Sequence, residues 1–173
     1  MRYLLASVTF LAAAPASAII VSAQSHGFEL KHSIDLPVPP AQALAAFARY
    51  GSWWSKSHTY SGDASRLTLQ LRAGGCLCER LDGGGGVEHM RVAYYQPGER
   101  VVLIGGLGPL LFEATSGVMD VRVAKTRTGS QLVLNYRAAG FARGNGTQLA
   151  AGVDQVLREQ VERLRAYASK GKS

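Results

Sequence analysis

The sequence predicts an α+β fold in which a curved antiparallel sheet of six or seven strands, with two short helices after the first strand, wraps around one long C-terminal helix. Two observations predict it. Over residues 147–170 apolar side chains recur at three- and four-residue steps, the repeat of one buried helix face. Before them, segments of alternating apolar and polar residues follow one another with turn residues between. A run of strands followed by a helix favours an α+β arrangement over alternating β-α units.

The C-terminal helix is the longest that the pattern predicts. Thr147 is expected to cap its N-terminus, and Gly171 to end it. Gln160 falls near the middle of the apolar stripe, where a buried amide must find a hydrogen-bond partner or cost stability. The stripe itself comprises Leu149, Val153, Val156, Leu157, Val161, Leu164 and Tyr167.

The strands are predicted from two-residue alternation. Residues 28–36 form the first, with His32 on its apolar side as a hydrogen-bonded core residue. A short Ala-rich helix over 41–48 follows the prolines, and Trp53-Trp54 lie at the next corner. The apolar loop 108–117 is expected to be a cavity lid or a packed hairpin edge. The remaining strands are expected at 66–72, 76–81, 87–95, 100–107, 118–125 and 132–138.

A Gly-rich hairpin loop at 83–86 pairs Glu79 with Met90 and Cys78 with Arg91. A slip of one residue in either strand would move that strand's side chains to the opposite face, so the assignment depends on this loop. In this register the apolar face carries Leu77, Leu81, Met90, Val92 and Tyr94, together with Glu79 and Glu88. The other face carries Cys76, Cys78, Arg80, His89 and Arg91.

Length and charge indicate one globular domain without a nucleic-acid partner. The 173 residues are 47% hydrophobic and 18% charged, which suits an ordinary domain with a core. A net charge of +7 and a pI near 9.7 would suit an anionic partner. Because the Arg and Lys residues are scattered singly, nucleic-acid binding is not predicted.

The N-terminus predicts export. Residues 1–23 have the pattern of a secretory signal peptide, cleaved after Ala18 or after Ala23, which leaves a single domain over 24–173 in the periplasm or outside the cell. An uncleaved membrane anchor is the alternative, whereas cleavage leaves no stable membrane span. Cys76 and Cys78 would then meet an oxidising compartment. In an extended strand their Cα atoms would lie roughly 6.5 to 7 Å apart, so packed thiols are expected in place of a disulfide. A soft-metal or redox pair is the other interpretation.

Several local motifs, taken in order, resemble a known superfamily. They are Trp53-Trp54 with His58-Thr59-Tyr60-Ser61, then residues 74–80, 87–92 and 105–110, and Val153-Asp154-Gln155-Val156-Leu157 leading to Gln160. In this order the chain resembles the START-related, helix-grip domains of the polyketide cyclase and birch-pollen-allergen type. It is most similar to the branch named after activators of a heat-shock chaperone's ATPase.

The resemblance implies a hydrophobic cavity between the sheet and the C-terminal helix, without implying one chemistry. We therefore expect an exported protein that binds a small hydrophobic ligand, lipid or polyketide-like, with no cofactor. Because an exported protein would be separated from a cytosolic chaperone, we do not expect such a partner. The residues expected to bind the ligand are Trp53, Trp54, Glu79, Glu88, Met90, Tyr94 and Gln160.

Two other functions remain open. One is a cyclase or dehydratase that uses Glu79 as an acid or base, since a buried carboxylate is paired, protonated or functional. The other is a ligand-free interaction domain with a filled core. A metal site of Cys76, Cys78 and His89 is not expected, because Arg80 and Arg91 beside it would repel a cation. The sequence has no phosphate loop and no nucleophile elbow.

Overall fold

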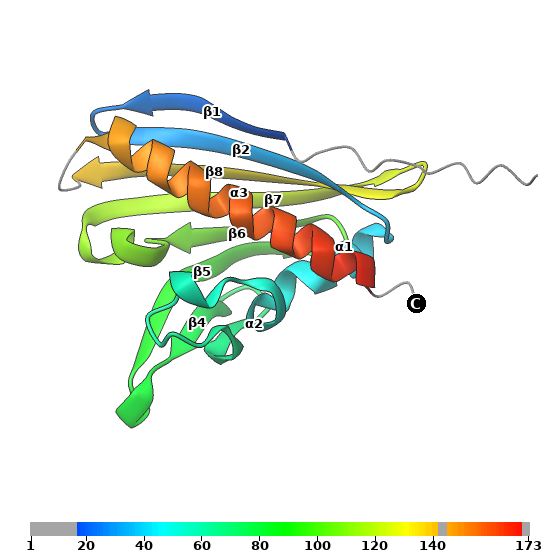
Figure 1. The fold of residues 1–173 in the computed structure, drawn as a ribbon, viewed down its shortest axis with the longest axis horizontal. Helices are drawn as coiled ribbons and strands as arrows, with labels where there is room; N and C mark the ends of the chain where they lie inside the picture. Colours follow the sequence, from blue (N-terminus) through cyan, green and yellow to red (C-terminus); the bar gives the residue numbers. More distant parts are fainter. Residues whose placement is uncertain (1–16, 142–144, 171–173) are drawn as a thin grey trace, which may run out of the picture.

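The computed structural model describes residues 17–141 and 145–170, and its main element is an eight-stranded antiparallel sheet. The strand order is β1-β2-β8-β7-β6-β5-β4-β3 (Figure 1). The predicted α+β class is confirmed, with one strand more than expected. The strands are β1 (Ser17–Gln24), β2 (Gly27–Leu36), β3 (Leu67–Leu69), β4 (Cys76–Arg80), β5 (Gly86–Gln96), β6 (Arg100–Gly105), β7 (Ala114–Thr126) and β8 (Gly129–Phe141).

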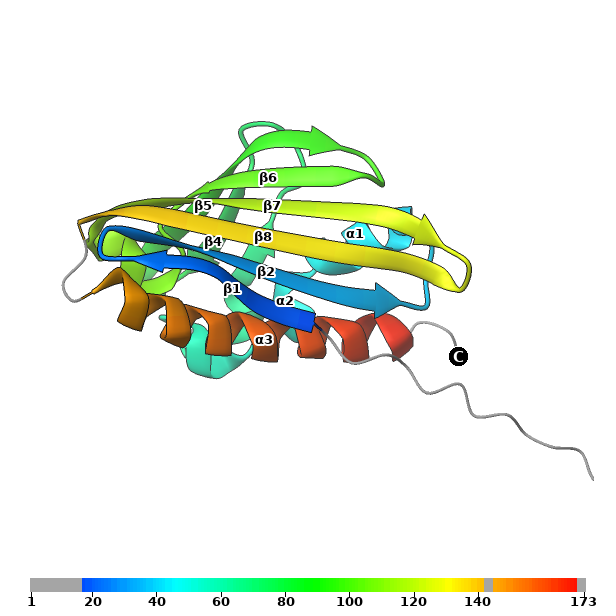
Figure 2. The ribbon, with the colours of Figure 1, turned by 90° about the horizontal axis from the view of Figure 1, so that it is seen from above.

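One long helix and two short ones cover a single face of this sheet. Helix α3 (Gly146–Lys170) runs along that face, and Figure 2 shows it beneath β1 and β2. Helices α1 (Pro40–Ala48) and α2 (Tyr50–Trp53) follow β2, as predicted. Within the described ranges, no helix is both long and apolar enough to span a membrane. The described residues also form the 3-10 turns η1 (Lys56–His58), η2 (Ala64–Arg66), η3 (Asp82–Gly84) and η4 (Gly108–Phe112).

Strand β1 is the additional strand, and it overlaps the predicted signal peptide. It pairs antiparallel with β2 and leaves Ile19, Ile20 and Val21 exposed. The first sixteen residues of the predicted signal peptide lie outside the described residues. The predicted Ala18 cleavage site would leave most of β1 in place, whereas cleavage after Ala23 would remove nearly all of it.

Helix α3 begins one residue earlier than predicted. The Asn145 side chain accepts a hydrogen bond from the Thr147 N–H at 2.9 Å, so Asn145 caps the helix in place of Thr147. Further along, Leu157, Val161 and Leu164 are buried as the stripe predicts. The helix is described as far as Lys170, and Gly171, its predicted stop, lies outside the described residues.

A bulge in β5 overturns the predicted hairpin register. Leu77 pairs with Met90 but Cys78 pairs with Glu88, so His89 is an extra residue in β5. Glu79 pairs with Val87 and not with Met90. The loop occupies residues 81–85, where Gly83 adopts a left-handed φ of 69°. Because a bulge reverses the alternation, His89 and Met90 are both buried and Glu88 is exposed. The expectations that Glu88 faces inward and His89 outward are therefore wrong.

A second bulge in β5 corrects the expectation for Tyr94. Val92 pairs with Leu103 and Tyr94 with Val102, which leaves Ala93 as the extra residue. Tyr94 is consequently 47% exposed, with the Arg100 guanidinium 5.5 Å from its ring centroid. Tyr95 packs against the core in its place. The expected inward position of Tyr94 is wrong because the sequence does not reveal the inserted residue.

The two cysteines form a disulfide, which contradicts the expectation of free thiols. The Cα atoms of Cys76 and Cys78 lie 5.4 Å apart, within the range that a disulfide bridges. The expected separation assumed a fully extended strand. The shift of register between Leu77 and Cys78 occurs within this segment and accompanies the shorter distance.

Candidate functional site

A cavity of about 600 Å³ lies between the sheet, the N-terminal half of α3 and the loops of η1 and η4. Most of its wall is apolar, and its polar groups come mainly from the loop 57–60 and from His89. Its volume is in the range of small-molecule sites. The lining residues are Tyr50, Trp54, Ser57, His58, Thr59, Tyr60, Leu67, Leu77, His89, Leu107, Gly108, Pro109, Asn145, Gln148, Leu149, Gly152, Val153, Val156 and Leu157.

The first turns of α3 form one wall of the cavity. Leu149, Val153 and Val156 belong to the predicted apolar stripe, yet each is only partly buried. These three side chains line the cavity, whereas the last part of the stripe packs into the core. Gly152 lies among them, and a Cβ atom at this position would meet no atom within 4 Å. The helix therefore leaves space at Gly152 next to an apolar wall.

An aromatic cluster closes the end near α2. The Trp54 ring stacks on Tyr50 with centroids 5.2 Å apart, and both residues line the cavity. Trp54 Nε1 donates to the His58 carbonyl at 2.9 Å, which holds the η1 loop against the indole. Trp53 packs behind them, and its Nε1 donates to the Ala46 carbonyl at 3.0 Å. Of the predicted tryptophan pair, Trp54 is thus the one at the cavity surface.

Glu79 is the buried carboxylate that the sequence singled out, and it is fully paired. It is 1% exposed, and its oxygens accept the backbone N–H groups of Ser61 at 2.6 Å and Tyr60 at 3.2 Å. Glu79 Oε2 also lies 3.0 Å from His89 Nε2. Burial alone would raise the pKa of the Glu79 carboxyl, but the hydrogen bonds from Ser61, Tyr60 and His89 outweigh it and hold that pKa below its usual value. Glu79 is therefore an ionised hydrogen-bond acceptor.

His89 connects this carboxylate with the cavity. With Nε2 donating to Glu79, a neutral imidazole carries a lone pair on Nδ1. That Nδ1 is buried and has no hydrogen-bond partner within the described part of the chain. The Tyr60 ring stacks on the imidazole with centroids 5.7 Å apart. Burial and the Glu79 charge both raise the pKa of the Tyr60 phenol, so it is neutral at physiological pH.

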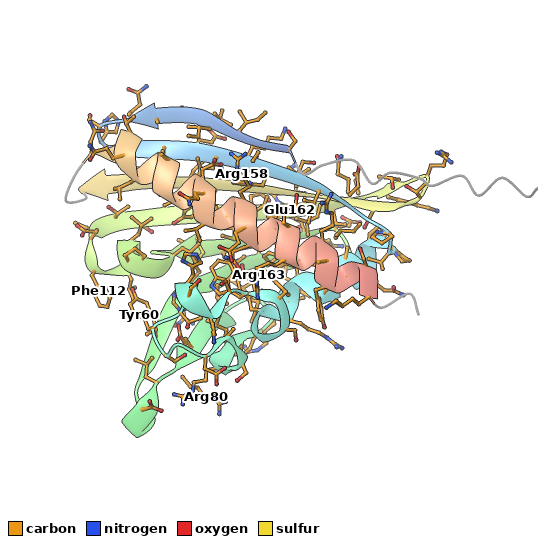
Figure 3. The ribbon with its side chains drawn as sticks, viewed as in Figure 1. Tyr60, Arg80, Phe112, Arg158, Glu162 and Arg163 are labelled. Atoms are coloured by element: carbon orange, nitrogen blue, oxygen red, sulfur yellow. A yellow bond between two sulfur atoms is a disulfide. The ribbon has the colours of Figure 1, made fainter. Side chains whose placement is uncertain are left out.

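Tyr60 also joins the two loops at the rim. Its hydroxyl donates to the Gly108 carbonyl at 2.9 Å, and its ring meets the edge of Phe112 at 5.8 Å between centroids. Figure 3 shows Tyr60 and Phe112 next to each other at one edge of the molecule. Leu110 is buried, whereas Leu111 and Phe112 are exposed. The predicted lid segment thus begins with a 3-10 turn held to the η1 loop.

The other predicted site residues lie away from the cavity surface. Met90 is fully buried in the core. Gln160 is 1% exposed, and its Oε1 accepts the Ser55 N–H at 2.8 Å. Gln160 therefore bonds to the loop after α2 and does not line the cavity. Exposed Glu88 pairs with Arg91, and the metal site of Cys76, Cys78 and His89 is not assembled because His89 lies on the opposite face.

The sequence marks Tyr60 as a loop residue that could join a site, but it does not predict that His89 and the Tyr60 N–H bond to Glu79. His89 was placed outward because strict alternation was assumed through residues 87–95, where the bulge inserts an extra residue. Tyr60 lies in a loop whose path no periodicity specifies. The signal that could have pointed to both is the need of buried Glu79 for donors.

Comparisons with known proteins support the fold. No protein-family model matches the sequence, and no curated protein matches it. An uncharacterized protein from Rhizobium leguminosarum shares the fold at 15% identity and a TM-score of 0.62, over 90% of this chain and 98% of that one. A Mesorhizobium loti protein has 16% identity and a TM-score of 0.60, covering 84% and 98%. A Staphylococcus aureus protein of unknown function has 12% identity and a TM-score of 0.61, covering 84% and 95%. Similarity at these identities shows the fold alone.

Proposed function

We propose that this protein binds a small, mainly apolar molecule in the cavity between the sheet and α3. The observation that carries the proposal is the cavity itself, about 600 Å³ in volume and walled largely by Leu, Val, Tyr and Trp side chains. Interiors are normally packed to crystal density, so a space of this size is unusual unless something fills it. A ligand-free interaction domain would not need it.

We propose that His89 binds the polar group of the ligand. Its Nδ1 is buried without a partner, and an unsatisfied buried polar atom costs free energy that a ligand donor would recover. Because Glu79 accepts a hydrogen bond from the Nε2–H group of His89, the other ring nitrogen, Nδ1, acts as an acceptor. A hydroxyl group on an otherwise apolar skeleton fits this site. Because Nδ1 is buried, a side chain of the cavity wall must move for the hydroxyl to reach it.

A cavity-filling substitution tests the proposal. Gly152→Phe places a side chain next to the apolar wall, while Ala151→Phe adds the same bulk at an exposed neighbouring position that does not line the cavity. The proteins are purified in parallel from one host and analysed by native mass spectrometry, with solvent extraction of bound molecules. We expect an apolar adduct on the wild type and on Ala151→Phe that is absent from Gly152→Phe. An adduct of equal occupancy on all three would contradict binding in this cavity.

A second function is favoured by one observation, the hydrogen bond between Glu79 and His89 at the cavity wall. A carboxylate that orients an imidazole is a common arrangement for general acid-base catalysis. We propose His89 as the base or acid and Glu79 as its positioning residue, in a cyclase- or dehydratase-like reaction. Glu79→Gln should then abolish turnover of a candidate polyketide-like substrate and spare binding. Turnover unchanged in this variant would rule out the catalytic assignment.

Export and superfamily membership are also proposals. We infer that the chain is a START-like helix-grip protein of the periplasm or cell exterior. The α+β fold supports the first part, and the Cys76–Cys78 disulfide supports an oxidising compartment. Intact-mass measurement of the protein after cell fractionation tests it. A mass that corresponds to a chain starting at Ile19 would mean that most of β1 is kept, and one that corresponds to a chain starting at Gln24 would mean that nearly all of it is removed. An uncleaved chain in the cytosol would contradict export.

A further inference from the structure

A second group of chemically reactive side chains lies on the face of the sheet away from the cavity. Cys76 and Cys78 occupy alternate positions of β4, and Glu88 is the cross-strand partner of Cys78. The two sulfurs and a Glu88 carboxylate oxygen lie within 4.8 Å of one another. The intervening Leu77 points to the buried side. The His89 bulge produces this arrangement, because it sets Glu88 opposite Cys78.

The disulfide in this group is poorly suited to a stabilising role. It joins residues two positions apart, and the stabilisation that a disulfide gains by constraining the unfolded chain becomes smaller as the closed loop becomes shorter. The ladder already holds both cysteines, since Cys78 pairs with Thr68 of β3 and Cys76 with Arg91 of β5. Both cysteines are only partly buried, so a reductant can reach them. Loss of the bond should leave the fold intact.

We propose that Cys76–Cys78 is a reducible disulfide whose dithiol form binds a thiophilic divalent cation, such as Zn²⁺, with Glu88 as the third ligand. A dithiol reductant breaks the S–S bond, supplies two electrons and two protons, and becomes a disulfide itself. The cation then displaces two protons and bonds to both thiolates. At Zn–S distances of about 2.3 Å, tetrahedral geometry sets the sulfurs about 3.8 Å apart, within the span of this group. The fourth position faces solvent.

Charge balance also favours the site. Two thiolates and one carboxylate carry three negative charges, and a divalent cation neutralises two of them. Arg91 supplies the remaining positive charge, since it pairs with Glu88 and donates to the Gly74 carbonyl at 3.0 Å. The guanidinium that would repel a cation from neutral thiols thus offsets the excess charge of the reduced site.

Zinc competition against a chromophoric chelator tests the proposal on the untagged full chain. We expect the reduced wild type to bind one Zn²⁺ and the oxidised protein to bind at least tenfold more weakly. Glu88→Gln should weaken binding to the reduced protein about tenfold or more, whereas Glu99→Gln, which changes an exposed carboxylate in the turn after β5, should not. With Co²⁺ the reduced wild type should show a sulfur-to-metal charge-transfer band that Cys76→Ser/Cys78→Ser lacks.

Three results would overturn the inference. Zinc binding that is equal in the reduced and oxidised proteins would exclude the cysteines. Equal affinities of Glu88→Gln and wild type for Zn²⁺ would exclude the three-ligand site. Loss of the near-ultraviolet circular dichroism on reduction would show that the disulfide is a structural bond. None of these results depends on whether the cavity binds a ligand, so the two proposals fail separately.

Discussion

Two buried histidine-carboxylate pairs have similar N–O distances but different positions in the fold, and of the two only His89–Glu79 has the geometry of a hydrogen bond. His32 of β2 is fully buried, and its Nε2 lies 3.2 Å from Asp154 Oδ1 of α3. His89 of β5 has its Nε2 3.0 Å from Glu79 Oε2 of β4. The first pair joins the sheet to the helix that covers it. The second joins neighbouring strands that the backbone ladder already connects.

The surroundings of the two pairs explain what each is for. Asp154 also accepts a hydrogen bond from Arg158 at 2.6 Å on the same helix, and neither His32 nor Asp154 lines the cavity. Glu79 accepts two loop N–H groups instead, and its partner His89 is part of the cavity wall. A histidine-carboxylate pair between separate layers therefore contributes to the packing of the helix on the sheet. A pair between adjacent strands is not needed to join them, so it is available for function.

The largest expected effect is on the pair between the layers. Asp154→Ala removes the carboxylate that faces buried His32 and leaves a polar ring nitrogen of His32 without a neighbouring partner, which should lower the free energy of unfolding by about 2 kcal/mol. Urea denaturation measures it. Asp35→Ala, which removes an exposed carboxylate of β2, should change it by less than about 0.5 kcal/mol and serves as the control. If the two variants had equal stabilities, His32 and Asp154 would not join the layers as described.

His89→Phe should have a smaller effect on stability and a larger one on binding. Phe preserves the stacked ring next to Tyr60, and Glu79 retains its two backbone donors, so the loss should be about 1 kcal/mol. In the wild type 2-naphthol should bind about fivefold more tightly than naphthalene, because its hydroxyl group makes one hydrogen bond to His89 that naphthalene lacks. The preference should vanish in His89→Phe and persist in His32→Phe. A preference that survives His89→Phe would contradict the assigned polar contact.

The two pairs should also differ in how their contributions to stability change with pH. Burial lowers the pKa of His32, Asp154 raises it and Arg158 lowers it, with a net decrease below 6.5. The unfolded state then binds the proton more readily, so stability that is complete above pH 6.5 is lost as the pH falls through the lowered pKa, by at most about 1.4 kcal/mol per pH unit. The pKa of Glu79 is lowered from 4.5, so its contribution is lost only below that pH. Urea midpoints between pH 7 and 5 should fall in wild type by more than in His32→Phe. Parallel curves would contradict the His32 assignment.

Tyr60→Phe should have the smallest effect. It removes the exposed hydrogen bond to the Gly108 carbonyl and preserves the ring over His89, so stability should change by about 0.5 kcal/mol or less. Because this bond joins the loops at the rim, 2-naphthol should dissociate faster from the variant in stopped-flow measurements. An unchanged dissociation rate would mean that the rim bond does not limit ligand exit.

The sequence predicted the elements that obey a simple period. Helix α3 and strand β2 were expected nearly at their observed bounds, because one buried face repeats along each. Burial of Glu79 was expected too, although from a register that the structure corrects. Strand β1 was missed because its apolar residues were assigned to a signal peptide.

The site was harder to predict because it depends on departures from those periods. A bulge in β5 decides whether His89 or Glu88 faces inward, and it depends on how two strands pair and not on either strand alone. Asp154 is buried because His32, distant in sequence, meets it across the layers. Tyr60 reaches Gly108 through a loop without a repeat. Such contacts arise from tertiary structure.

The most direct test of the account is a titration of the wild type and Gly152→Phe with the fluorescent probe 1-anilinonaphthalene-8-sulfonate, with urea denaturation of both proteins in parallel. Gly152→Phe should be as stable as wild type or about 0.5 kcal/mol more stable, because it replaces a helical glycine. One saturable probe site is expected on the wild type and none on the folded variant. Equal probe affinity in two equally stable proteins would contradict a ligand-binding cavity between the sheet and α3.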